Sequence, residues 1–280
     1  MRLDRIADDI YILMSDNYAQ VTCTVLTTAL GAILVDTMPF PEDARQVLAF
    51  IEDKLGPRSV RYVITTHHHA DHTYGAYVFG DGLMIAQQEC YRNLRRYGQA
   101  QLERAKRDTP ALAPVQLRLP DVTFGRELHL HLGHRHLHLF HTPGHTADAI
   151  SIHIPEEKAV IAGDTVMPVP YIAAGSPEQL RKSLLTIQEL KPSFVVQGHG
   201  EVLLRGEVDE AIDSSIRYLE AIEEKVKQVV ERGQPASRLK AIDIESCGKS
   251  RIPLDGLVAR LHTSNLMALY REYTKVRPDA

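Results

Sequence analysis

The segment that most constrains this chain of 280 residues is His-His-His-Ala-Asp-His at positions 67–72. It directly follows the apolar run 60–65, which predicts that the segment lies where a strand ends and a helix begins. In an extended segment, residues two apart project to the same side, so His67, His69 and Asp71 can converge. The last histidine of the segment, His72, can join them once the chain turns. Imidazole and carboxylate groups at this spacing suit Zn, Fe or Mn, so the segment predicts a metal site.

Three further segments have the same form, in which an apolar strand delivers a ligand-type residue next to glycine. They are His-Thr-Pro-Gly-His-Thr at 141–146, Val-Ile-Ala-Gly-Asp-Thr at 160–165 and Val-Val-Gln-Gly-His-Gly at 195–200. Glycine allows the tight turn that aims a side chain back across the ends of the strands. A single such turn is common, but the set in this order is specific. It adds three candidates, which are His145, Asp164 and His199.

The rest of the chain predicts clusters of strands that alternate with helices, in two similar halves. The first half contains strand-like runs at 10–14, 21–27, 32–36 and 60–65 and a helical pattern at 41–55. The second half contains a hairpin at 128–140, strands at 149–154, 159–162 and 194–196, and a helix at 177–190 capped by Ser176. A proline-rich loop spans 108–121, and the tail from 207 is mostly helical. This order favours two sheets with helices outside them, in one domain over 1–280.

Taken together, these motifs resemble the metallo-β-lactamase-fold metallohydrolase superfamily over about residues 10–205. The resemblance implies an α/β fold, an αββα sandwich of two mixed β-sheets flanked by helices, with metals at the sheet ends. Its core would span about 1–206 and a C-terminal helical extension 207–280. The implied ligands are His67, His69 and His145 for one metal, Asp71, His72 and His199 for a second, and Asp164 bridging both. Asp36 matches an early aspartate that usually orients a ligand.

The bridging position carries information about the reaction. Dedicated class B β-lactamases of this superfamily lack an aspartate there, whereas glyoxalase II, lactonase and phosphodiesterase branches have one. The resemblance therefore implies a hydrolase other than a dedicated β-lactamase, with two divalent ions, zinc being favoured and Fe or Mn left open. We hypothesise that a metal-bridging hydroxide attacks an ester, thioester, lactone or related carbonyl, or a phosphodiester. Asp71 would handle the proton, and Tyr171 would donate to the oxyanion unless it is an ordinary loop aromatic.

Two other functions are compatible with the same motifs. One is a mononuclear-iron oxidoreductase on this fold, similar to persulfide dioxygenases, which metal content would distinguish from a two-zinc hydrolase. The other is a non-catalytic protein with a structural metal. A closed structural site needs only about four ligands, and more candidates than that are present, so the enzyme is favoured.

The remaining histidines gather on the predicted hairpin, where they alternate mostly with leucine. They are His129, His131, His134, His136, His138 and His141. A second metal site or a pH sensor is one interpretation. We favour the outward face of an amphipathic hairpin, because no carboxylate or thiolate is expected beside them. In the last helical segment, His262 and Asn265 could line the pocket, but we favour a solvated helical face for them.

Composition limits the partners and the location. The net charge of −4 provides no basic field for nucleic acid. The start of the chain does not read as a signal peptide, and no uncharged apolar run reaches the roughly 18 residues that a membrane span requires. We therefore expect a cytoplasmic protein that acts on a small molecule and has neither nucleic-acid nor membrane partners. The sequence does not specify the oligomeric state.

Overall fold

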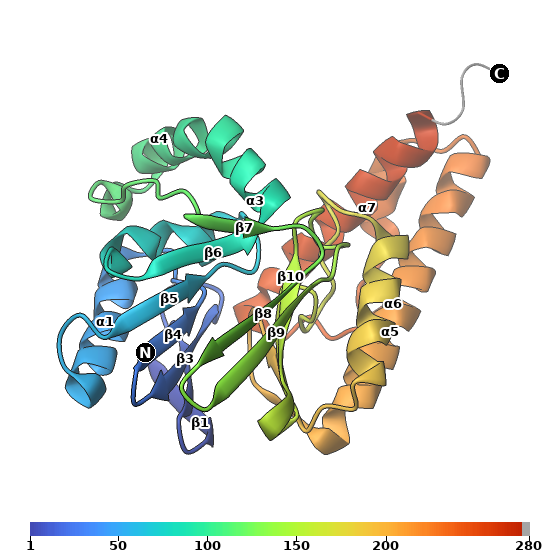
Figure 1. Ribbon diagram of the computed structural model, residues 1–280. Coiled ribbons are helices and arrows are strands. Elements are labelled where there is room, and N and C mark those ends of the chain that lie inside the picture. The colour runs from blue at the N-terminus through green and yellow to red at the C-terminus, as the bar shows by residue number, and fades with distance from the viewer. Residues whose placement is uncertain (276–280) are drawn as a thin grey trace.

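A computed structural model describes residues 1–275 and contains two β-sheets that face each other, with helices on both outer sides (Figure 1). The first sheet has seven strands in the order β1-β2-β3-β4-β5-β6-β7. These strands are β1 (Arg2–Ala7), β2 (Ile10–Met14), β3 (Thr22–Thr28), β4 (Gly31–Val35), β5 (Val60–Ile64), β6 (Leu83–Gln87) and β7 (Val122–Phe124). Strands β1 to β4 pair antiparallel, whereas β4 to β7 pair parallel, so the sheet is mixed.

The second sheet has six strands in the order β13-β12-β11-β10-β9-β8. Its strands are β8 (Glu127–Leu132), β9 (Arg135–His141), β10 (Ile150–Ile154), β11 (Ala159–Gly163), β12 (Phe194–Gln197) and β13 (Leu203–Leu204). Only β11 and β12 pair parallel, so this sheet is mixed as well.

Helices cover the outer side of each sheet. The α-helices are α1 (Pro41–Leu55), α2 (Ala70–Thr73), α3 (Gln88–Asn93), α4 (Gln99–Asp108), α5 (Pro177–Glu189), α6 (Arg205–Glu231) and α7 (Leu257–Lys275). A π-helical segment, η2 (Leu94–Gly98), joins α3 to α4. Short 3-10 segments are η1 (Tyr74–Phe79), η3 (Pro110–Leu112), η4 (Pro155–Glu157), η5 (Ala236–Ala241), η6 (Glu245–Cys247) and η7 (Leu254–Gly256).

Three apolar layers hold this arrangement together, because each strand face that leaves water must be covered by another element. Between the sheets, residues such as Ile33 and Ile64 pack against Leu139 and Ile152. Helix α1 packs on the outer face of the first sheet, and α5, α6 and α7 pack on the second. Together these layers confirm the predicted αββα sandwich.

The predicted elements agree with the structure except at four strands that were not predicted: the interior strand β6 and the edge strands β1, β7 and β13. Helix α1 has the predicted bounds, and the side chain of Ser176 accepts a hydrogen bond from Gln179 N at the start of α5, as a cap does. Strands β1 and β7 were not predicted, because both lie at an edge of the sheet and carry exposed polar residues. The prediction of one domain, with a boundary near 206, stays a prediction.

Strand ends from both sheets meet at one rim of the sandwich. The carboxyl ends of the parallel pairs β4–β5 and β11–β12 lie there, and the chain crosses between the sheets at the same place. Thr22 N, on β3, donates to Gly198 O after β12 at 2.9 Å. No helix in the described residues is long and apolar enough to cross a membrane.

Candidate metal centre

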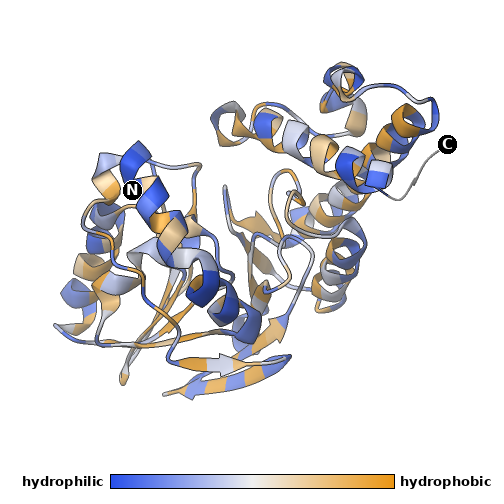
Figure 2. Cartoon of the chain, turned by 90° about the horizontal axis from the view of Figure 1, so that it is seen from above, coloured by the Kyte–Doolittle hydropathy of each residue, from blue (hydrophilic) through white to orange (hydrophobic). Residues whose placement is uncertain are grey.

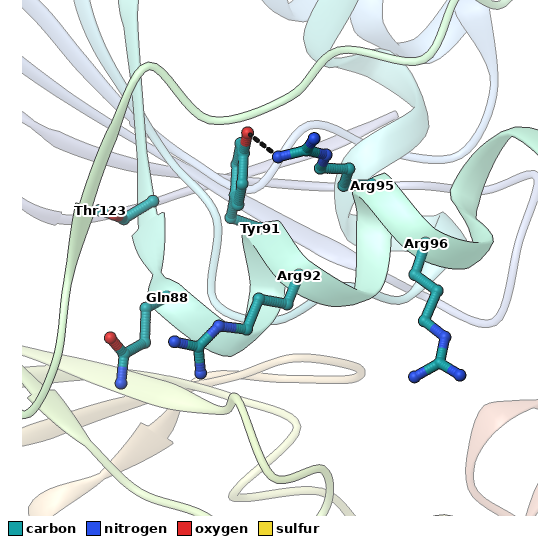
Figure 3. Close-up of a pocket in the computed structure, with 6 residues that line it drawn as sticks. All are labelled: Gln88, Tyr91, Arg92, Arg95, Arg96 and Thr123. Carbon is teal, nitrogen blue, oxygen red and sulfur yellow. Dashed lines mark hydrogen bonds between the residues drawn. The ribbon is translucent and has the colours of Figure 1, made fainter.

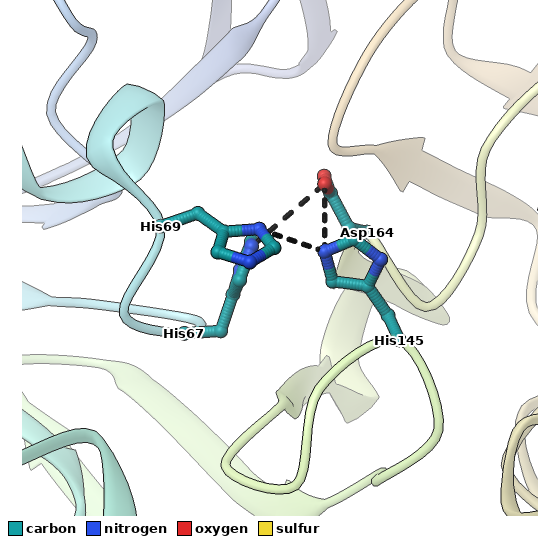
Figure 4. Close-up of side chains that lie close together, drawn as sticks. All are labelled: His67, His69, His145 and Asp164. Carbon is teal, nitrogen blue, oxygen red and sulfur yellow. Dashed lines mark hydrogen bonds and ion pairs between the residues drawn. The ribbon is translucent and has the colours of Figure 1, made fainter. Parts of the chain in front are cut away.

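The ligand-type residues predicted from the four motifs meet at this rim. His67, His69, His145 and Asp164 form one group, and Asp71, His72 and His199 form a second, with candidate ligand atoms in each group within 4.8 Å of one another. Figure 4 shows the first group, in which the side chains arrive from the loops after β5 and β9 and from the end of β11. The structure thus brings together every residue of the expected ligand set.

Asp164 lies between the two groups and presents one oxygen to each. Its Oδ2 is 3.3 Å from His145 Nε2 and 3.7 Å from His67 Nε2. Its Oδ1 is 3.2 Å from His72 Nε2 and 3.5 Å from His199 Nε2. This is the arrangement that a carboxylate bridging two cations requires.

Four of the five histidines are oriented by a contact on the nitrogen that faces away from the centre. His145 Nδ1 donates to Tyr171 O at 2.8 Å, and His199 Nδ1 donates to Ala19 O at 2.9 Å. His67 Nδ1 contacts Thr66 Oγ1 at 3.1 Å, and the fourth, His72, contacts a carboxylate described below. Such contacts fix the tautomer, so that the opposite nitrogen is free to bind a metal.

Asp36 provides that carboxylate at the end of β4. Its Oδ2 accepts from His72 Nδ1 at 2.8 Å and from Thr66 Oγ1 at 2.7 Å, while its Oδ1 accepts from Thr66 N. The residue has a φ of 60°, a left-handed conformation that aspartate tolerates better than most residues. It is buried and orients His72, as the resemblance implied.

The glycine before His199, Gly198, is required by the close packing of the centre. A Cβ at this position would lie 1.9 Å from Asp164 Oδ1, far inside van der Waals contact. Only a residue without a side chain lets the turn after β12 pass this close to the bridging carboxylate. The glycine therefore serves the packing of the centre rather than the turn alone.

Three buried atoms of the cluster show that its residues fit metal ions. Within the described residues, His67 Nε2, His72 Nε2 and Asp164 Oδ1 are buried and have no hydrogen-bond partner. Buried polar atoms are normally paired, and leaving one unpaired costs about 1–3 kcal/mol. All three face the interior of the cluster, where cations would satisfy them.

Protonation differs between the two groups. Burial lowers the pKa of His67 and of His69, the latter to about 3, so these imidazoles are neutral at pH 7. At His199 burial acts in the same direction, but Asp164 and Asp71 outweigh it and raise its pKa to about 10. The metal-free second group therefore holds protons that a cation would replace, because metal ligands must be deprotonated.

A cavity of about 530 Å³ opens onto the cluster. Its walls include Asp71, Asp164 and His199 from the cluster, and Leu254, Leu257 and Leu261 from the C-terminal segment. The C-terminal helices thus help to form the cavity, whereas no residue of the 108–121 loop lines it. Among the described residues that line the cavity, none is lysine or arginine.

The expectation that His262 and Asn265 lie on a solvated face is wrong, since both are buried. Asn265 Oδ1 accepts from Ile172 N at 2.8 Å, and its Nδ2 donates to Pro170 O at 2.7 Å. Helix α7 is therefore fixed to the loop that carries Tyr171. Sequence periodicity could not reveal this, because polar side chains that bond to a distant loop look like solvated ones.

Three tyrosines, Tyr18, Tyr74 and Tyr171, lie on the cavity wall. Tyr171, predicted from the sequence, lines the cavity, and its backbone carbonyl rather than its hydroxyl contacts His145. Tyr18 was missed, because it lies far from every motif in the sequence. The carboxylate of Asp71, together with burial, raises the pKa of Tyr18 to about 12, so its hydroxyl keeps its proton.

A second cavity, of about 610 Å³, lies over α3 and η2 and has a different chemistry (Figure 3). It is lined by Gln88, Tyr91, Arg92, Arg95, Arg96 and Thr123. Arg92 pairs with Glu89, and Arg95 donates to the hydroxyl of Tyr91 at 3.5 Å. This second cavity is lined by none of the cluster residues. The candidate substrate site is therefore the cavity of about 530 Å³ that opens onto the cluster.

Comparisons with known proteins agree with this geometry. The family model of the metallo-beta-lactamase superfamily matches residues 17–199, which contain all the candidate metal ligands. This chain therefore belongs to the metallo-β-lactamase superfamily.

Two curated relatives have similar sequences. A hydroxyacylglutathione hydrolase of Legionella pneumophila (strain Paris) is 24% identical over 240 residues, covering 82% of this chain and 80% of the relative. A beta-lactamase-like protein 2 homolog of Drosophila melanogaster is 25% identical over 219 residues, covering 76% and 68%. One of these relatives is thus named a hydrolase and the other a beta-lactamase-like protein.

Solved structures support the fold. The metallo-beta-lactamase from Pontibacter korlensis superposes with a TM-score of 0.60 at 19% identity, covering 76% of this chain and 97% of its own. The sec-alkylsulfatase Pisa1 from Pseudomonas sp. superposes with a TM-score of 0.75 at 15% identity. That match covers 99% of this chain, including the C-terminal helices, and 52% of the sulfatase.

Proposed function

We propose that this protein is a hydrolase with two divalent metal ions, zinc in the native state, that cleaves a carbonyl ester, thioester or lactone. The observation that carries the proposal is the position of Asp164, with one oxygen toward each group of histidines. His67, His69 and His145 would hold one ion, and Asp71, His72 and His199 the other. When bound, zinc lowers the pKa of coordinated water to about 7 and polarises a carbonyl.

Two side chains of the protein would assist the reaction, Asp71 by proton transfer and Tyr171 by stabilising the oxyanion. Asp71 lines the cavity, and its Oδ2 lies 3.3 Å from His199 Nε2, so its carboxylate is held at the place where a proton must be accepted and released. His72 and His199 hold its pKa well below the usual range against the effect of burial, which keeps the carboxylate ionised, as a metal ligand must be. The hydroxyl of Tyr171 would donate to the developing oxyanion.

The walls of the cavity favour an uncharged, apolar acyl group. Leucines of the C-terminal segment, together with Met167 and Ala174, supply apolar surface, and the described lining contains no lysine or arginine. A glutathione thioester carries carboxylates that need such cations. We therefore infer an ester or lactone with an aliphatic acyl chain, in contrast to the substrate named for the Legionella relative. The bridging aspartate argues against a dedicated β-lactamase.

A matched substrate panel tests this proposal. The zinc-loaded enzyme is assayed with aliphatic acyl esters and lactones, an acyl-glutathione thioester, a phosphodiester and a β-lactam, with Asp164→Ala as the control. We expect the highest kcat/KM for the aliphatic esters or lactones and none for the control. Preference for the glutathione thioester would contradict the inferred substrate, and a fully active control would contradict the metal hydrolase.

The oxidoreductase alternative receives no support from the relatives described above. It requires a single redox-active iron, whereas the geometry offers two groups of ligands joined by one carboxylate. A chain that contained one iron and consumed oxygen would restore that alternative.

A further inference from the structure

Histidines also gather on the outer face of the β8–β9–β10 part of the second sheet. The leucines and isoleucines of these strands pack between the sheets, as the alternation along the hairpin predicts. Figure 2 shows hydrophobic and hydrophilic residues alternating along these strands. The opposite face carries what we call the histidine face. It consists of Glu127, His129 and His131 on β8, His136 and His138 on β9, and His153 on β10.

The strand register places these residues in rows across the sheet. His129 is paired with His138, which is in turn paired with His153, and His131 is paired with His136 in the next row. Side chains on directly paired residues have Cβ atoms about 4.5–5.5 Å apart, within reach of one ion. An amphipathic hairpin needs polar residues here but not imidazoles, so the alternation alone does not explain this composition.

The side chains already lie close together. The rings of His129 and His138 are stacked with centroids 4.5 Å apart, and His129 Nδ1 lies 2.8 Å from His136 Nε2. The expectation that no carboxylate lies beside these histidines is wrong, because His138 Nε2 is 3.3 Å from Glu127 Oε2. Sequence separation hid this contact, since Glu127 and His138 are on neighbouring strands.

We propose that the histidine face is a second metal site, in which Glu127, His129 and His138 bind a late first-row divalent cation such as Zn²⁺. One candidate ligand atom from each residue lies within 4.8 Å of the other two. Ligands about 2.1 Å from a tetrahedral ion are roughly 3.4 Å apart, so the Glu127–His138 separation already fits. Imidazole nitrogen and carboxylate oxygen form a donor set that zinc accepts, and solvent would complete the coordination.

Titration of the metal-loaded enzyme tests this site. Protein whose catalytic centre is saturated with zinc, and from which excess metal is removed, is titrated with Zn²⁺ by calorimetry. Three variants are compared with the unaltered protein: His129→Gln/His138→Gln, Glu127→Gln, and His134→Gln as a control. His134 lies on the same hairpin but contacts Asp9 instead of the histidine face.

We expect about one further Zn²⁺ per chain in the unaltered protein and in the control. The double variant should lose this binding by more than about 100-fold, because even a supporting partner is worth roughly 10- to 100-fold in affinity. Esterase activity should be unchanged. Glu127→Gln should weaken the site too, and because Glu127 is exposed this variant tests the site even where the double variant is unstable. Absence of further zinc binding, or equal binding in the double variant, would overturn the proposal.

Discussion

The candidate metal centre and the histidine face use the same side chain in opposite surroundings. In the cluster, His67, His72 and His145 are at most 1% exposed, and backbone carbonyls, hydroxyls or a carboxylate hold their outer nitrogens. On the histidine face, the imidazoles on β8 are exposed and stack on the imidazoles of β9. Supporting contacts, rather than the number of histidines, therefore distinguish a preorganised centre from an adaptable surface site.

The largest expected effect is the loss of a cluster ligand. His69→Ala and Asp164→Ala should each lower activity by more than about 1,000-fold, since supporting partners alone are worth roughly 10- to 100-fold. Metal content and kcat/KM are measured together, with His134→Gln, which lies outside both regions, as a control. Activity retained without metal in either variant would contradict the claim that the cluster, and not the histidine face, is the metal-dependent centre.

A smaller loss is expected when the bridging carboxylate is displaced rather than removed. Gly198→Ala places a methyl group 1.9 Å from the original position of Asp164 Oδ1, so the carboxylate or the turn must move. We expect kcat/KM to fall about 100-fold, in keeping with the roughly 100-fold cost of a 1 Å misplacement.

Gly206→Ala is the matched control for this substitution, because a Cβ there meets nothing within 4 Å. It should leave kcat/KM unchanged. Equal activity of the two alanine variants would show that Asp164 does not need its observed position.

Asp36→Asn tests support without removing a ligand. Asparagine can still accept from Thr66, but it lacks the charge that holds His72. Metal affinity should fall by roughly 10- to 100-fold, and excess zinc should restore activity. An affinity equal to that of the unaltered protein would mean that outer contacts do not distinguish the two histidine regions.

Tyr171→Phe should have a still smaller effect. The backbone carbonyl that orients His145 remains, so metal content should not change. One neutral hydrogen bond contributes about 1 kcal/mol, which corresponds to a roughly fivefold lower kcat. Stopped-flow kinetics with an aliphatic ester measures kcat separately from KM. A loss of metal would instead assign Tyr171 a structural role.

The same comparison shows what the sequence could predict. Motifs such as His-His-His-Ala-Asp-His identify the cluster, because consecutive residues after one strand must arrive at one rim. Contacts between distant segments were missed. Glu127 beside His138, Tyr18 beside Asp71, and Asn265 bonded to Ile172 all depend on strand register or helix docking, which local patterns do not encode.

Metal content per chain is the most direct test of the central claim that Asp164 joins two metal positions. Protein purified without added metal, then dialysed against metal-free buffer, is analysed by plasma mass spectrometry beside Asp164→Ala and His129→Gln/His138→Gln. We predict about two tightly held divalent ions in the unaltered protein and in the histidine-face variant, and a loss of both metal and esterase activity in Asp164→Ala. Two ions retained in Asp164→Ala, or a single redox-active iron in the unaltered protein, would contradict the account.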